Sequence, residues 1–104
     1  MGSSKGEHKA RLREWKEAQR VDARKSFPLS NEILAKFFEA LEVRVEENGC
    51  HHDTRQAGLA SVQVGIAPFD IERLLAWCAE QGGFCDCEII LNTYGYWEEN
   101  RDDD

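Results

Sequence analysis

The chain has 104 residues, of which 41% are hydrophobic, enough for one domain with a modest core. This composition is typical of a globular protein and excludes a largely disordered chain. No apolar run approaches the roughly 20 residues that a membrane-spanning helix needs, and the N-terminus lacks the apolar segment of a secretory signal. We therefore expect a cytoplasmic protein without a membrane partner, in which clustered cysteines are metal ligands or reactive thiols.

The net charge of −7 is unevenly distributed along the chain. Residues 1–26 contain eight Lys or Arg and four acidic residues, a balance of +4, so the remainder carries −11. Such a basic arm can contact nucleic acid, or it can lie along its own acidic domain or that of a second subunit. Nucleic-acid binding needs phosphate neutralisation over a surface, so the acidic body argues against a nucleic-acid partner. We expect a protein partner or a homodimer.

Two helices are expected in the first half of the chain. Residues 8–26 contain good helix formers with a narrow apolar stripe that includes Trp15, and Phe27-Pro28 ends this helix. Ser30 is expected to cap a second helix, and Gly49 to end it. The apolar positions of the second helix recur at the spacing of a broad buried face: Ile33, Leu34, Phe37, Phe38, Leu41 and Val45.

The second half predicts two further helices and one strand. Residues 54–64 favour a short helix, and Asp70 is expected to cap a helix that Gly82-Gly83 ends. The buried face of that last helix would comprise Ile71, Leu74, Leu75 and Cys78. Residues 84–92 are expected to be extended, with a partner strand around 94–97 or from a second chain.

Cysteine and histidine gather in two clusters about thirty residues apart, and each cluster follows a glycine. Thiolate and imidazole are the ligands that Zn²⁺ prefers, and four of them close a tetrahedral site. In extended chain, residues two apart point to the same side, which pairs Cys85 with Cys87 and favours His52 over His51 beside Cys50. The predicted ligands of a structural Zn²⁺ are therefore Cys50, His52, Cys85 and Cys87, with His51 as the alternative ligand.

Several other interpretations of these residues remain open. The cysteines can be plain buried thiols, as we expect for Cys78, or Cys50 can form a disulfide or redox pair with Cys85 or Cys87. A catalytic metal would need an open position and a nearby acid–base group, for which the adjacent carboxylates are Asp53, Asp86 and Glu88. A nucleophilic dyad of Cys85 and His52 is also chemically feasible.

The residues that carry these clusters resemble a known family. Gly49-Cys50-x-His52 with Arg55, then Gly82-Gly83-Phe84-Cys85-Asp86-Cys87-Glu88-Ile89, are similar to the bacterial domain-of-unknown-function family 2695. The Phe27-Pro28-Leu29 junction is similar too, so the resemblance covers roughly residues 27–92. In that family the first cluster usually reads cysteine, aspartate, histidine, threonine, whereas here His51 replaces the aspartate and Asp53 precedes Thr54. The resemblance implies a bacterial, intracellular protein whose Cys50, His52, Cys85 and Cys87 act as a set; it implies no reaction.

Together these observations predict a mainly helical α+β domain of about four helices with a short C-terminal strand, stapled by a metal. The expected organisation is a basic helical arm over residues 1–26, a compact core over 27–97 and an acidic tail over 98–104. The expected function is that of a zinc-stabilised binding or regulatory module rather than an enzyme. The alternative is a metal- or thiol-dependent enzyme of unknown substrate.

Overall fold

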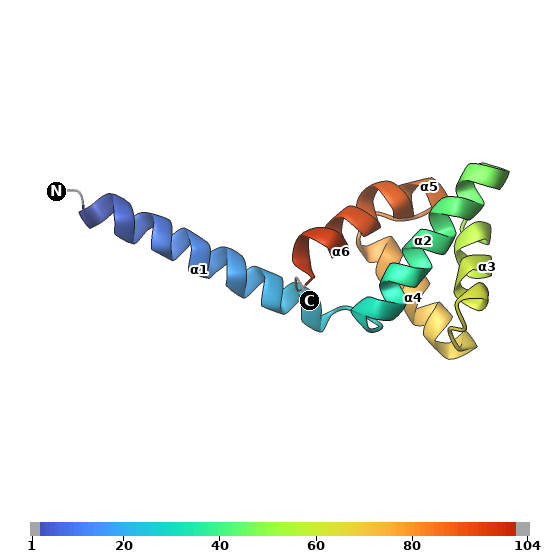
Figure 1. The fold of residues 1–104 in the computed structure, drawn as a ribbon, viewed down its shortest axis with the longest axis horizontal. Helices are drawn as coiled ribbons and strands as arrows, with labels where there is room; N and C mark the ends of the chain where they lie inside the picture. The colour runs from blue at the N-terminus through green and yellow to red at the C-terminus, as the bar shows by residue number, and fades with distance from the viewer. Residues whose placement is uncertain (1–2, 102–104) are drawn as a thin grey trace.

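A computed structural model describes the backbone of residues 3–101 and the side chains of residues 11–101, so residues 102–104 of the expected acidic tail lie outside it. Its elements in chain order are α1 (Ser3–Lys25), α2 (Asn31–Asn48), α3 (Arg55–Gln63), α4 (Pro68–Glu80), α5 (Asp86–Glu88), the π-helical segment η1 (Ile89–Thr93) and α6 (Tyr94–Asn100). The helices α2 to α6 pack into one body, and α1 projects from it as a long arm (Figure 1). The molecule accordingly measures 58 × 24 × 22 Å.

The second helix, α2, has the caps that the sequence predicts and is the centre of the core, although Ile33, predicted on its buried face, is exposed. The Ser30 hydroxyl accepts the Ile33 amide hydrogen at 3.3 Å and caps the N-terminus. Gly49 ends the helix with a φ of 76°, in the left-handed region that favours glycine. The core packs around the buried face of α2 and comprises Leu34, Phe37, Phe38, Ala40, Leu41, Ala57, Ala60, Ile66, Leu74, Trp77, Cys78, Ile89 and Trp97.

The short helix α3 is confirmed, whereas α4 begins earlier than predicted. It starts at Pro68, whose fixed φ and missing amide hydrogen suit the first helical position. Asp70, expected at the cap, lies inside the first turn instead, where its carboxylate pairs with Arg73 at 3.0 Å. A carboxylate in this turn still favours the helix, because it faces the positive end of the helix dipole.

The predicted strand at residues 84–92 is wrong, and with it the α+β class. These residues enter α5 and η1 and continue into α6, and no strand occurs in the described part of the chain. Apart from Asp86, the buried side chains here are Cys85, Ile89, Thr93 and Trp97, which recur every four residues as on a helix. The sequence favoured a strand because Ile89, Ile90 and Leu91 are consecutive apolar residues. The four-residue spacing was harder to recognise, because one of its buried positions is the polar Thr93.

The expectation that a metal staples the fold is also corrected. Within residues 3–101, no group of three or more His, Cys, Asp or Glu side chains is arranged to hold a metal ion. The body is instead held by apolar packing, including the aromatic contacts of Phe38 with Tyr94 at 5.1 Å and with Trp97 at 5.2 Å between ring centroids. A core of this kind forms without an ion.

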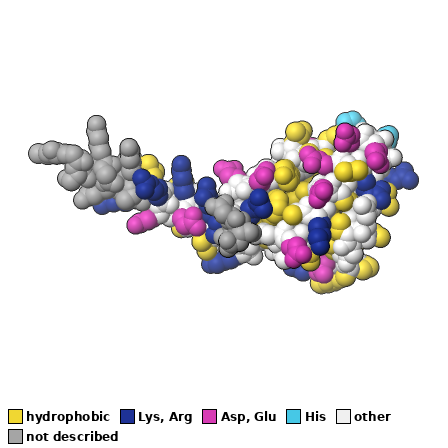
Figure 2. Space-filling view, viewed as in Figure 1, with side chains coloured by type: hydrophobic (Ala, Val, Ile, Leu, Met, Phe, Trp, Pro, Cys, Tyr) yellow, Lys and Arg dark blue, Asp and Glu magenta, His cyan; other side chains and the backbone are white. Residues whose placement is uncertain are grey.

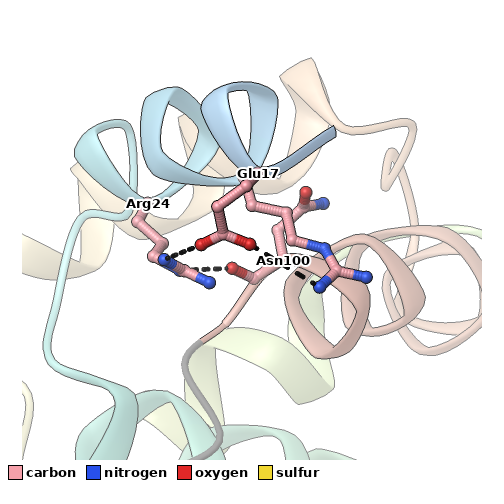
Figure 3. Close-up of polar contacts among 4 residues, drawn as sticks. Glu17, Arg24 and Asn100 are labelled. Atoms are coloured by element: carbon pink, nitrogen blue, oxygen red, sulfur yellow. Dashed lines mark hydrogen bonds and ion pairs between the residues drawn. The ribbon is translucent and has the colours of Figure 1, made fainter. Parts of the chain in front are cut away.

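One joint connects the arm to the body, at the C-terminal end of α1 (Figure 3). The Arg24 Nε donates a hydrogen bond to the backbone oxygen of Asn100 at 2.7 Å, and Glu17 lies 3.5 Å from the same guanidinium. Beyond this joint the arm is exposed, and Trp15 keeps 58% of its surface accessible. Over the described residues, no helix has the length and apolar character needed to cross a membrane.

Candidate functional site

Asp86 joins the two clusters that the sequence singled out. Its side chain is 1% exposed, and the carboxylate accepts the amide hydrogens of Gln56 at 3.1 Å and Ala57 at 2.9 Å. These amides belong to the first turn of α3, so Asp86 acts as its cap from a distant part of the chain. The Asp86 amide donates in turn to the Asp53 oxygen at 2.8 Å. The loop after α2 is thereby fixed against the start of α5.

Three thiols meet at this junction. Cys50 Sγ accepts the amide hydrogen of Cys87 at 3.4 Å, and the thiols of Cys87 and Cys85 lie near enough to influence its pKa. The backbone amide of Cys87, helped by these thiols and the amide of His52, holds the pKa of Cys50 below that of an ordinary thiol. Cys50 is therefore the sulfur that ionises first.

The two neighbouring thiols keep their protons more firmly. The hydrogen bond to Cys50, reinforced by burial and by the negative charge on that sulfur, raises the pKa of Cys87 to about 11. For Cys85 the amide of Glu88 acts to lower the pKa, but burial and the Cys50 sulfur together outweigh it, and the pKa is raised. These three residues, of which Cys50 loses its proton most readily, form a cluster that we call the thiol centre (Cys50, Cys85 and Cys87).

The predicted histidine ligands do not join the thiol centre. His51 and His52 are both exposed, at the edge of the body (Figure 2). His52 has a φ of 62°, a left-handed conformation that is uncommon for a residue other than glycine. Neither imidazole forms a hydrogen bond or ion pair with the described residues. Of the four predicted ligands, the structure brings together the three cysteines.

Cys78 lies apart from the thiol centre, on the buried face of α4, as the sequence predicts. Burial raises the pKa of its thiol to about 12, and a hydrogen bond with Thr93 opposes this rise. All four cysteines are free thiols. The thiol centre therefore differs from the core cysteine in exposure and in protonation.

Sequence reasoning missed the role of Asp86, which it treated as a residue facing away from Cys85 and Cys87. Period-two geometry produced that error, because a strand would put Asp86 on the opposite face. In a helix that begins after Cys85, the first turn carries both Asp86 and Cys87 toward the loop 49–54. The four-residue spacing from Cys85 to Trp97 was the signal for a helix in this segment, although it does not reveal which amides Asp86 caps.

Comparison with known proteins identifies the family of this chain, but the family and the relatives have no described activity. A family described as protein of unknown function (DUF2695) matches residues 37–92, which include the thiol centre. Uncharacterised proteins of Mycobacterium tuberculosis and Mycobacterium bovis are each 31% identical over 79 residues, which is 76% of this chain and 77% of each relative. No solved structure matches this chain.

Proposed function

We propose, given that this chain belongs to the DUF2695 family of proteins of unknown function, that it is a zinc-binding regulatory or binding module without catalysis of its own. The observation that supports the proposal is the meeting of Cys85 and Cys87 at the Cys50 sulfur, which accepts the Cys87 amide hydrogen at 3.4 Å. The thiol centre would bind the ion, with His52, or alternatively His51, as the fourth ligand. A full set of four protein ligands leaves no position for a substrate.

The donor chemistry fits Zn²⁺ in two respects. Zinc–sulfur bonds of about 2.3 Å in a tetrahedron place the sulfurs roughly 3.8 Å apart, which is a separation that hydrogen-bonded thiols also adopt. The Cys87 amide that donates to Cys50 also stabilises negative charge on sulfur, as a thiolate ligand requires. When bound, Zn²⁺ would keep all three sulfurs ionised. The chain's own contribution is to hold them together through the cap that Asp86 makes on α3.

Zinc occupancy would act on the loop 49–54 rather than on the core. Both histidines lie in this exposed loop, two residues or fewer from Cys50. Recruiting one of them would turn its exposed imidazole toward the thiol centre, in a loop that the Asp86 amide already fixes against α5. The apolar core of α2, α3, α4 and α6 does not depend on that step. This is a suitable arrangement for regulation, because one part of the surface changes while the body stays folded.

The contact surface of the module would be its arm. The α1 helix carries the basic residues of the N-terminal segment and an exposed Trp15, whereas carboxylates are numerous on the body (Figure 2). An acidic partner protein or the acidic body of a second copy is the complement to such a helix.

A second candidate function rests on the lowered pKa of Cys50. A thiol that ionises early is a better nucleophile near neutral pH, so a thiol-dependent enzyme is the alternative. The two candidates make opposite demands on the same sulfur, because a zinc-bound thiolate is no longer free to attack a substrate.

Metal analysis of protein purified without chelator tests the proposal. We expect one zinc per chain. Zinc should be lost in Cys50→Ala, Cys85→Ala and Cys87→Ala. The affinity for zinc should fall in His52→Ala if His52 is the fourth ligand, or in His51→Ala if His51 is. Cys78→Ala is the matched control, because it removes a cysteine outside the thiol centre and should retain zinc. Circular dichroism should show folded protein after zinc removal. Protein that contains no zinc and takes up none in a titration overturns the proposal, and rapid alkylation of Cys50 in that protein would favour the thiol enzyme.

A further inference from the structure

A second polar site lies beside the thiol centre, between the last turns of α2 and the first turn of α3. It is a cavity of about 280 Å³, lined by Arg44, Asn48, His51, Arg55, Gln56 and Leu59. The volume suits a small polar ligand, since cavities for drug-sized molecules generally begin near 300 Å³. We name it the arginine cavity.

The charge of the arginine cavity is unusual for this chain. The whole protein carries a net charge of −7, yet two arginines and no carboxylate line the cavity. Among residues 11–101, neither Arg44 nor Arg55 forms an ion pair with an acidic side chain. Asp53 is close to Arg55 in the chain, but its Oδ1 accepts the backbone amide of Arg55 at 3.1 Å. Two guanidinium groups are thus left without a counter-charge.

A side-chain hydrogen bond positions Arg44, and Arg55 begins the neighbouring helix. The Arg44 Nε donates to Gln63 Oε1 at 2.9 Å, which directs one side of the guanidinium to α3 and leaves its terminal nitrogens for a ligand. Arg55 is the first residue of α3, on the opposite wall of the cavity. Two planar guanidinium groups on neighbouring helices can donate hydrogen bonds to several oxygens of a tetrahedral oxyanion.

Gln56 adds a buried polar group to the cavity. The residue is only 7% exposed, and its Oε1 has no hydrogen-bond partner. An unsatisfied buried carboxamide oxygen costs stability, so this side chain is held in place by its surroundings rather than by its own bonds. Gln56 therefore contributes a buried carboxamide to the wall of the cavity. The first amides of α3 take no part, since Asp86 already accepts those of Gln56 and Ala57.

We propose that the arginine cavity binds a phosphate group, either as inorganic phosphate or as the phosphate of a small phosphomonoester. Arg44 and Arg55 would neutralise its charge from two helices, and Gln56 and Asn48 would donate neutral hydrogen bonds. The site shares only His51, the alternative zinc ligand, with the zinc proposal, and neither arginine belongs to the thiol centre.

Titration calorimetry with inorganic phosphate, at ionic strength held constant with sodium chloride, tests this proposal. We expect saturable binding at one site and a loss of affinity of roughly tenfold or more in Arg44→Gln and in Arg55→Gln. Arg13→Gln is the matched control, because Arg13 is an exposed arginine on α1, and it should bind as the unmodified protein does. Gln63→Ala removes the contact that positions Arg44 and should give an intermediate loss.

Glycerol 3-phosphate as a second ligand separates the two sources of the phosphate group: tighter binding than inorganic phosphate indicates a phosphomonoester, and weaker binding indicates the free ion. Circular dichroism establishes that each variant is folded, and unchanged zinc content in the arginine variants separates this site from the thiol centre. The proposal fails if binding is weaker than about 10 mM, if chloride competes as well as phosphate, or if Arg13→Gln weakens binding as much as Arg55→Gln.

Discussion

Cys78 is the residue whose protonation is coupled most directly to the stability of the body. Its thiol is fully buried on α4, and burial raises its pKa from the ordinary 9.0 to about 12. Above pH 9 the unfolded chain loses this proton while the folded chain keeps it. The stabilisation is therefore complete below pH 9 and is lost as the pH rises toward 12, by at most about 1.4 kcal/mol per pH unit.

Urea unfolding of the unmodified protein and of Cys78→Ala across this pH range measures the effect. At neutral pH we expect Cys78→Ala to be less stable by about 1–2 kcal/mol, because the smaller side chain leaves a cavity. That difference should shrink above pH 9 and reverse its sign before pH 12, since only the unmodified protein carries the linked proton and its loss of up to about 1.4 kcal/mol per pH unit soon exceeds the initial difference. A difference that stays constant over the range would show that Cys78 does not titrate in this way.

Individual residues also show how far the sequence could predict the site. Cys78 was predicted as a core residue from its place on an apolar helix face. The grouping of Cys50 with Cys85 and Cys87 was predicted from the two clusters in the sequence. The capping by Asp86 was not predictable from either signal. It depends on α3 and α5 meeting in space, over a separation of 30 residues in the chain. Local spacing carries no information about such a contact.

At the scale of helices, the close approach of the α4–α5 turn to η1 depends on Gly83. A Cβ atom on Gly83 would lie 2.5 Å from Thr93 Oγ1 and 3.0 Å from the Cys78 backbone oxygen. The Gly83 amide and the Thr93 hydroxyl both donate to that same oxygen, at 2.7 Å and 3.1 Å. There is no space for a side chain without moving a helix.

We therefore expect Gly83→Ala to lower the free energy of unfolding by about 1–3 kcal/mol, as overpacked core substitutions do. Gly95→Ala is the matched control, because Gly95 lies inside α6 with no atom within 4 Å of the added Cβ. It should stabilise the protein by about 0.5–1 kcal/mol, since alanine is the better helix former. Chemical denaturation followed by circular dichroism gives both values. Equal effects of the two substitutions would mean that the turn relaxes to admit a methyl group.

The helices illustrate which elements a single sequence reveals. The second helix was predictable because six apolar residues on one face, a serine cap and a terminal glycine all agree. Residues 84–100 were not, because β-branched and apolar side chains at Ile89 and Ile90 favour a strand while the buried positions follow a helix. Tertiary packing decides between the two, since Ile89 and Trp97 both join the core around α2.

At the scale of the whole molecule, the central question is how firmly the arm is joined to the body. An isolated helix of the length of α1 is only marginally stable in water, so its order depends on contacts with the body. The Arg24 guanidinium provides the most direct of these, because its Nε donates to the Asn100 oxygen at 2.7 Å, while Glu17 of the same helix lies 3.5 Å from it (Figure 3). Removing its charge should loosen the arm and leave the body nearly unaffected.

Hydrogen–deuterium exchange of Arg24→Gln measures whether the arm loosens independently of the body. We expect faster exchange in the C-terminal half of α1 with unchanged protection in α2, and a change in the unfolding free energy of the body below about 1 kcal/mol. Lys25→Gln is the matched control, because Lys25 forms only an exposed ion pair with Asp22 at 3.7 Å, and α1 should exchange as in the unmodified protein. Loss of protection in α2 as well as α1 would mean that the arm and the body unfold as one unit. In that case α1 would support the core, and it could not act as a separate surface for a partner.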